Sequence, residues 1–276
     1  MNETRETILN VDDLTVVYHS GNALVHAVNG VSFSLRRGET LALVGETGAG
    51  KTTIARAILQ ILPQPQAEIR SGSIRFEGQE FTEMPERELT KIRGAKIAMI
   101  FQDPMTALNP LMTVGDQIME GLLLHNDYTQ GEAKARAREL LEMVGIPGVR
   151  AVEYPFEFSG GMKQRVIIAM ALACNPDLLL ADEPTSMIDA CSRSTILDML
   201  TKLRDEINMT VIFITHDIGL AYKISDKVYI MEHGKFVESG DAEEVIIHPK
   251  ADYTKRLISD VPKIYEEWDL DTVANA

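Results

Sequence analysis

Cysteine is scarce in this sequence, and the cysteines that occur form no recognisable pattern. Cys174 and Cys191 are the only two among 276 residues, and they are not spaced as CxxC. Disulfide frameworks and structural zinc sites depend on several cysteines at set spacings, so neither is expected. The sequence instead predicts a protein of a reducing compartment, with both thiols as small buried side chains.

Long apolar runs are also missing. The longest, Leu178–Ala181 and Val211–Ile214, have the length of a strand rather than the ~18 residues that cross a bilayer. Met1–Asn10 is mostly polar and lacks the apolar core of a secretory signal. We therefore expect a cytoplasmic protein with no direct lipid insertion, for which other chains would provide any path through a membrane.

Positive charge is in short supply. The sequence has 27 lysines and arginines against 41 aspartates and glutamates, a formal net charge of −14. So acidic a chain is not expected to bind nucleic acid or to lie directly on anionic lipid. Hydrophobic residues make up 45% of the chain, which is ordinary for a globular protein and sufficient for one large domain.

The apolar segments that are present predict an α/β fold. Thr40–Val44 is expected to form a strand that leads into a glycine-rich turn, and Thr52–Leu62 has helical spacing up to Pro63. The runs Leu178–Ala181 and Val211–Ile214 do not alternate with polar residues. Continuous apolar strands are typical of a parallel sheet that helices cover on both faces.

Further elements are expected on both sides of this centre. The first part of the chain contains short β segments, and residues 113–145 become helical and polar, as in an inserted helical subdomain. The expected strands are Leu14–Tyr18, Val31–Leu35, Ser73–Phe76 and Ile97–Phe101, and the expected helices cover Glu132–Val144, Gly160–Cys174 and Ser192–Ile207.

A phosphate-binding motif lies between the strand and the helix at the centre. Gly45–Thr52 (GETGAGKT) matches GxxxxGK[ST], in which glycines let successive N–H groups converge on phosphates at a helix N-terminus. Lys51 is placed to reach the β- and γ-phosphates, and the Thr52 hydroxyl to ligate Mg²⁺. The alternative of a purely structural turn is disfavoured by the flanking strand and helix. The motif predicts nucleotide binding without indicating the class of machine.

A pair of carboxylates follows the apolar strand Leu178–Ala181. Asp182 at the end of that strand would lie beside the Mg²⁺ next to the phosphate loop. Glu183, one residue later, can polarise a water for attack on the γ-phosphate. A helix cap or a solvated pair is the other interpretation, and the phosphate motif makes it the weaker one.

Ser159–Arg165 (SGGMKQR) opens the helix that leads to this strand. With it, the motifs resemble the ABC transporter ATPase family in order and spacing, from about Leu14 to Ser239. The resemblance implies a P-loop NTPase core with a parallel sheet, an N-terminal antiparallel β subdomain and an inserted helical subdomain over about 103–160. This ATPase domain would cover residues 1–240, and a C-terminal tail would cover residues 241–276.

The resemblance also implies roles for single residues. Tyr18 is similar to the aromatic that stacks on adenine, Gln102 to the glutamine that senses Mg²⁺ and water, and His216 to the switch histidine. Asp189 is similar to the aspartate of the family's D-loop. The expected catalytic residues are Glu183, His216, Gln102 and Lys51, and the expected Mg²⁺ ligands are Thr52, Gln102 and Asp182. The expected ATP-binding residues are Tyr18, Gly45, Glu46, Thr47, Gly48, Ala49, Gly50, Lys51, Thr52, Thr53, Ser159, Gly160, Gly161 and Asp189.

The segment Ser159–Gly161 has a physical logic of its own. It begins a helix, so its free N–H groups and the helix dipole form a second anion site. One chain cannot easily fold two such sites onto one phosphate, so a second chain would supply the matching half. Plain N-capping for Ser159 and plain packing for Tyr18 are the alternatives. A solvated or structural role is expected for every histidine except His216.

The finer resemblance is to the ATPases of oligopeptide, dipeptide and nickel importers. It rests on Met99–Pro110 (MIFQDPMTALNP), Tyr154-Pro155 and the tail segment His248–Leu257 (HPKADYTKRL). It implies an ATP-driven motor on the cytoplasmic face of the cell membrane. Its partners would be two polytopic membrane subunits, a second and non-identical ABC ATPase, and indirectly an extracellular solute-binding protein. The sequence is silent on the solute.

Three departures from the family pattern stand out. Phe158 replaces the usual leucine before the signature, Met187-Ile188 replaces Ala-Leu, and no cysteine follows Cys191, so no iron–sulfur cluster is expected in the tail. None removes a catalytic group. An exporter motor and a soluble ABC ATPase of translation or DNA repair remain as alternative functions.

Overall fold

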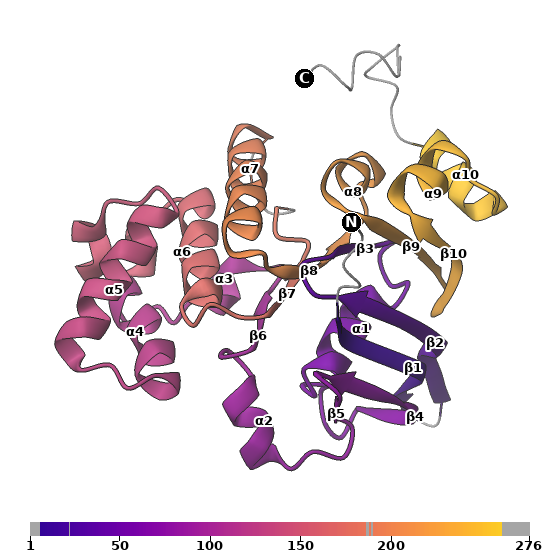
Figure 1. The fold of residues 1–276 in the computed structure, drawn as a ribbon, viewed down its shortest axis with the longest axis horizontal. Helices are drawn as coiled ribbons and strands as arrows, with labels where there is room; N and C mark the ends of the chain where they lie inside the picture. The colour runs from indigo at the N-terminus through magenta and orange to yellow at the C-terminus, as the bar shows by residue number, and fades with distance from the viewer. Residues whose placement is uncertain (1–5, 22, 186–187, 189, 261–276) are drawn as a thin grey trace.

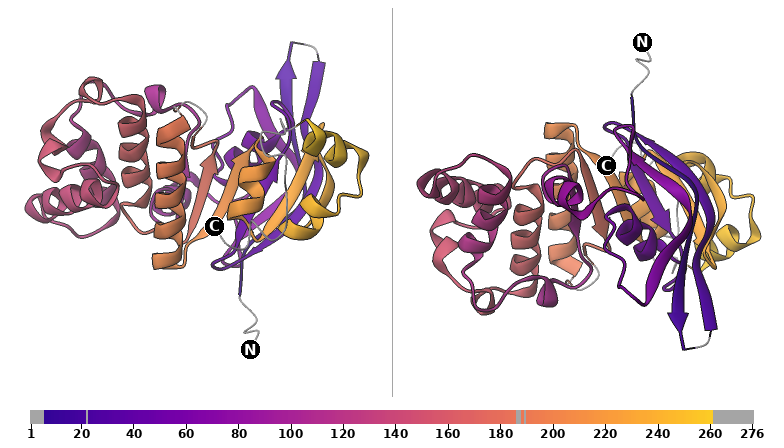
Figure 2. Two further views of the ribbon diagram at one scale, coloured as in Figure 1. Left: turned by 90° about the horizontal axis from the view of Figure 1, so that it is seen from above. Right: turned by 90° about the horizontal axis from the view of Figure 1, so that it is seen from below.

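A computed structural model describes residues 6–21, 23–185, 188 and 190–260 of the chain. Figure 1 shows a group of helices at one end, an antiparallel sheet at the other, and a mixed sheet between them. The two views in Figure 2 show the same arrangement. Among the described residues, no helix combines the length and the apolar character needed to cross a membrane.

The first sheet is antiparallel, with strand order β2-β1-β4-β5. Its strands are β1 (Thr7–Ser20), β2 (Ala23–Arg36), β4 (Ala67–Phe76) and β5 (Gln79–Glu80). Three of the expected strands are parts of these longer ones, namely Leu14–Tyr18, Val31–Leu35 and Ser73–Phe76. Register shifts, as between Val11 and Leu14, interrupt the alternation of apolar and polar residues, so the sequence pattern reveals each strand only in part.

The second sheet has the order β10-β9-β3-β8-β7-β6. Every pairing in it is parallel except that of β9 with β10, which confirms the expected parallel sheet. All residues of β3, β6, β7 and β8 are buried. The strands are β3 (Thr40–Val44), β6 (Ile97–Ile100), β7 (Leu178–Asp182), β8 (Thr210–Thr215), β9 (Lys227–Glu232) and β10 (Lys235–Asp241).

Alternate residues of these strands enter different hydrophobic cores. Leu178 and Leu180 of β7 pack with the antiparallel sheet and α1 (Lys51–Ile58). Leu179 and Ala181 pack with the helices on the other face. The central sheet is therefore covered on both sides, as continuous apolar strands require.

Most of the helices on the second face form the inserted group. They are α3 (Pro104–Ala107), α4 (Val114–His125), α5 (Gln130–Met143), the 3₁₀ helices η1 (Gly148–Val152) and η2 (Pro155–Glu157), and α6 (Gly160–Leu172). The amphipathic helix expected over Glu132–Val144 corresponds to α5. Its start lies earlier because Thr129 forms a capping box with Glu132.

Five further helices and the loops beside them complete the described chain. α2 (Glu86–Ile92) follows the antiparallel sheet, α7 (Ala190–Ile207) joins β7 to β8, and α8 (Ile218–Ile224) follows β8. The residues after Gly240, which the sequence analysis treated as a tail, contain α9 (Ala242–Ile247) and α10 (Asp252–Ser259). Both pack with α8 against β3 and β9. Each is too short for apolar periodicity to reveal it.

Candidate nucleotide site

The phosphate motif forms a loop between β3 and the N-terminus of α1. Gly50 is the N-cap of α1, with φ of 111°. A Cβ atom at Gly50 would lie 2.3 Å from the carbonyl oxygen of Ala27, and one at Gly45 would lie 2.2 Å from that of Met231. Both glycines are therefore required by close backbone approach, and the free N–H groups of the first turn of α1 face the loop as an anion site.

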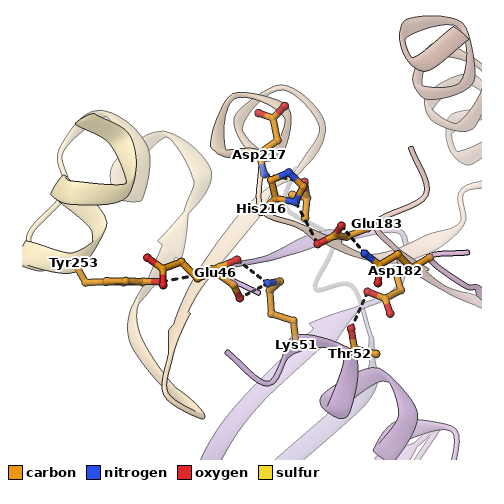
Figure 3. A network of polar contacts seen from close by, with 11 residues as sticks. Glu46, Lys51, Thr52, Asp182, Glu183, His216, Asp217 and Tyr253 are labelled. Carbon is orange, nitrogen blue, oxygen red and sulfur yellow. Dashed lines mark hydrogen bonds and ion pairs between the residues drawn. The ribbon is translucent and has the colours of Figure 1, made fainter. Parts of the chain in front are cut away.

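Lys51 folds back over this loop (Figure 3). Its ammonium group donates to the carbonyl oxygens of Gly45 at 2.6 Å and Glu46 at 2.8 Å. The side chain is buried, and this burial lowers the pKa of Lys51, although the carboxylates of Glu183, Asp182 and Glu46 act to raise it. The two carbonyls thus hold a cation at the place where phosphates would arrive.

Asp182 ends β7 beside the first turn of α1. The Thr52 hydroxyl donates to its carboxylate at 3.1 Å. Asp182 is 2% exposed, and burial raises its pKa above the ordinary value; Glu183 adds to this effect, whereas the Thr52 hydrogen bond opposes it. A buried carboxylate oxygen next to a hydroxyl oxygen suits Mg²⁺, which takes few protein oxygens and completes its shell with phosphate and water. These two residues fit the expected metal site.

Glu183 lies between two other residues of the expected catalytic set. Its carboxylate accepts from the Gln102 side-chain amide at 3.0 Å, and lies 3.2 Å from Nδ1 of His216. Gln102, Glu183 and His216 follow the carboxyl ends of the neighbouring parallel strands β6, β7 and β8, which brings them to one edge of the sheet. The Glu183 side chain is 11% exposed and that of His216 60%.

His216 is positioned by its neighbours in the chain. The backbone N–H of Asp217 donates to the Thr215 hydroxyl at 2.9 Å, and the Asp217 carboxylate caps α8 by accepting from Leu220 N at 2.9 Å. These contacts fix the turn between β8 and α8 on which the imidazole stands (Figure 3).

The structure places the signature segment elsewhere. Ser159 is the N-cap of α6, and its hydroxyl accepts from Met162 N at 3.4 Å. Ser159 and Gly160 are exposed at this helix end. N-capping and a second anion site are compatible, since both use the free N–H groups of one helix terminus.

The remaining expected ATP-binding residues lie on β1, in the phosphate loop and in the first turn of α1. Tyr18 is half-buried on β1 and packs against the core of the antiparallel sheet. Thr47 and Gly48 are exposed in the loop, whereas Ala49 and Thr53 are buried. Asp189 lies outside the described residues.

The sequence analysis missed one contact with the phosphate loop. The hydroxyl of Tyr253, on α10, accepts a hydrogen bond from the backbone N–H of Glu46, with 3.3 Å between the two atoms. Figure 3 shows the tyrosine reaching the loop from the side opposite Asp182. The tail segment 248–257 was singled out only for its resemblance, and nothing in the pattern indicated a contact across 207 positions.

Comparison with known proteins gives a consistent set of matches. The family model for ABC transporters matches residues 28–186. The oligopeptide transport ATP-binding protein OppD of Bacillus subtilis is 45% identical over 93% of this chain and 72% of its own length. The peptidoglycan transport ATP-binding protein YejF of Agrobacterium fabrum is 48% identical over 95% of this chain, which spans about half (49%) of YejF. The dimeric ABC transporter cassette MJ0796 aligns with a TM-score of 0.77 and 29% identity, covering 85% of this chain and 99% of the cassette.

Proposed function

Because the chain belongs to the ABC transporter family of ATP-binding proteins, we propose that it is the ATP-hydrolysing motor of a membrane importer for peptides or similar small solutes. The observation that carries the peptide-transport assignment is the 45% identity to an oligopeptide transport ATP-binding protein over nearly the whole chain. Nickel is a further candidate solute, on the sequence resemblance alone.

The geometry supports a mechanism for the hydrolysis. Lys51 would exchange the carbonyls of Gly45 and Glu46 for phosphate oxygens, and Thr52, Asp182 and Gln102 would hold Mg²⁺. When bound, Mg²⁺ supplies positive charge that offsets the charge on the phosphates. Glu183 would accept the proton of the attacking water.

The hydrogen bonds at Glu183 support this assignment. The Gln102 amide and the His216 ring both contact its carboxylate, and both would orient it toward the water. We further propose that His216 and Gln102 exchange their contacts with the Glu183 carboxylate for contacts with the nucleotide when ATP binds.

A second ATPase would complete each site. The N-terminus of α6, with Ser159, Gly160 and Gly161, would bind the γ-phosphate held by the other subunit, and Asp189 would lie at the interface. ATP then stabilises the closed dimer, and hydrolysis removes the charge that favoured it. We propose that the second ATPase is a non-identical homologue.

Two polytopic membrane subunits would receive the motion of the dimer. An apolar groove lies beside Phe101, between β6 and α6, and suits a short helix from such a subunit. Its apolar lining residues include Leu59, Ile61, Met99, Phe101, Ala107, Ile167 and Met170. With a net charge of −14, the chain would reach the cytoplasmic face of the membrane through these subunits rather than through lipid, and an extracellular binding protein would deliver the solute.

Affinity purification of the tagged full-length chain from its native membrane tests this proposal. Mass spectrometry is expected to identify two polytopic membrane proteins and a second ABC ATPase. The variant Phe101→Glu should lose the membrane proteins, because it replaces an apolar wall of the groove with a charged side chain that is costly to bury under an apolar helix. The matched control is Val237→Glu on β10, since Val237 and Phe101 are similarly exposed, at 37% and 39%.

Other outcomes would contradict specific parts of the proposal. Capture of ribosomal or DNA-repair proteins without membrane proteins would remove the transport function and leave the ATPase chemistry intact. Solute export, measured in vesicles of known orientation, would replace the importer by an exporter.

A further inference from the structure

Tyr253 contacts the phosphate loop from a part of the chain that lies outside the nucleotide motifs. Its hydroxyl accepts from the N–H of Glu46, the second residue of the loop. Among the expected site residues, Glu46 has no side-chain role in the mechanism above. The contact therefore involves the shape of the loop rather than the reacting groups.

The contact acts on a particular peptide unit. The N–H of Glu46 and the C=O of Gly45 belong to the same planar peptide, in which they point in opposite directions. The carbonyl oxygen of Gly45 accepts from the Lys51 ammonium at 2.6 Å, while the N–H donates to Tyr253. A hydroxyl that fixes the N–H consequently fixes the direction of the carbonyl that Lys51 meets.

Tyr253 is itself held firmly. It is 7% exposed, and its ring packs in the cluster that α8, α9 and α10 form with β3 and β9. The start of α10 is tied to β10, because the carboxylate of Glu238 accepts from the N–H groups of Lys250 and Ala251 at 2.8 and 3.1 Å. The Arg256 guanidinium lies 5.7 Å from the ring centroid.

The backbone of β9 also lies close to the start of the loop. Met231 belongs to that strand, and its carbonyl oxygen lies so close to Gly45 that a Cβ atom there would clash with it. Gly45 therefore lies against a carbonyl of β9, and the N–H of Glu46 contacts the hydroxyl on α10. Two elements from the C-terminal part of the described chain thus contact the first residues of the phosphate loop.

We propose that Tyr253 is a positioning residue for ATP binding, which holds the Gly45–Glu46 peptide in the orientation that the phosphate loop needs. This inference rests on the proposed function of the same site. A preorganised loop lowers the free energy of bound ATP in the ground state and the transition state alike, so its loss raises KM more than it lowers kcat.

Tyr253→Phe tests the inference, because it removes the hydroxyl and keeps the ring. In the full-length chain, the Kd for a fluorescent ATP analogue with Mg²⁺ is expected to rise roughly threefold to tenfold, the range of one hydrogen bond. Hydrogen exchange of the loop amides at 45–50 should become faster. In the purified complex, KM for ATP should rise by a larger factor than kcat falls.

Tyr229→Phe is the matched control. Tyr229 is a half-buried tyrosine of β9 that packs on Phe33 and Phe236 rather than on the loop. The control should change neither Kd nor loop exchange. An unchanged Kd in Tyr253→Phe, or an equal change in both variants, would overturn the inference while the proposed function stands. Failure of the wild-type chain to bind the analogue would overturn both.

Discussion

At the scale of single residues, the proposed mechanism makes hydrolysis depend on the carboxylate of Glu183. We expect Glu183→Gln to bind ATP and to hydrolyse it at least ~10²-fold more slowly, because an amide keeps the size of the side chain and cannot take the proton of the attacking water. Single-turnover hydrolysis measured beside nucleotide binding checks this expectation. Glu139→Gln, on the exposed face of α5, is the control. Turnover at the wild-type rate would remove Glu183 from the mechanism.

The residues of this site differ in how far the sequence reveals them. Lys51, Thr52 and Asp182 follow from spacing, because a phosphate loop and a carboxylate at the end of a buried strand are local patterns with a known geometry. Tyr253 could not be found in this way. Its contact with Glu46 depends on where α10 packs, and a tyrosine in a short polar helix has no signal that distinguishes it from ordinary packing.

At the scale of elements, the buried strands were the easiest to predict and the antiparallel sheet the hardest. β3, β7 and β8 are continuous apolar runs whose length and burial leave one interpretation. β1 and β2 each have 14 residues, but the irregular register between them breaks the two-residue period. The sequence therefore indicates the layer that carries the candidate catalytic residues better than the layer that packs against it.

A comparison of two helix N-caps can distinguish a purely structural role from a role in binding phosphate. Thr129 caps α5 by accepting from Glu132 N at 3.3 Å, and Ser159 caps α6 by accepting from Met162 N at 3.4 Å. We expect Thr129→Ala to lower Tm by roughly 2–4 °C, the effect of losing one cap in a chain of this size, without changing hydrolysis by the assembled complex.

Ser159→Ala should affect hydrolysis more than thermal stability. Its effect on Tm should be no larger, but hydrolysis by the complex should fall roughly tenfold or more, because a hydrogen bond to a charged phosphate is lost. Thermal unfolding and steady-state ATPase assays of the two variants check the pair. If both variants changed only Tm, Ser159 would be a helix cap and nothing more.

At the scale of the whole molecule, the proposed ATP site needs two subunits to come together, whereas the negative charge of the chain opposes their association. One candidate anion site lies at the N-terminus of α1 and another at the N-terminus of α6, and the proposed closed state joins them across two subunits. Each copy of this chain has a formal net charge of −14, and each bound ATP adds further negative charge. A dimer of identical copies would therefore form against long-range repulsion, which a less acidic partner would reduce.

This repulsion predicts how self-association depends on salt. In Glu183→Gln, where bound ATP persists, we expect ATP-dependent dimerisation of the isolated chain to strengthen as NaCl rises from about 50 to about 500 mM, because the Debye length falls from roughly 14 to 4 Å. Analytical ultracentrifugation with and without ATP measures the change, and Lys51→Ala is the control that should stay monomeric with ATP. Local contacts between ATP and the α6 terminus are screened less than repulsion between whole subunits, so the net effect of salt should favour the dimer. Weaker dimerisation at high salt would show that ion pairs at the interface outweigh the net charge, and would remove the electrostatic reason for a non-identical partner.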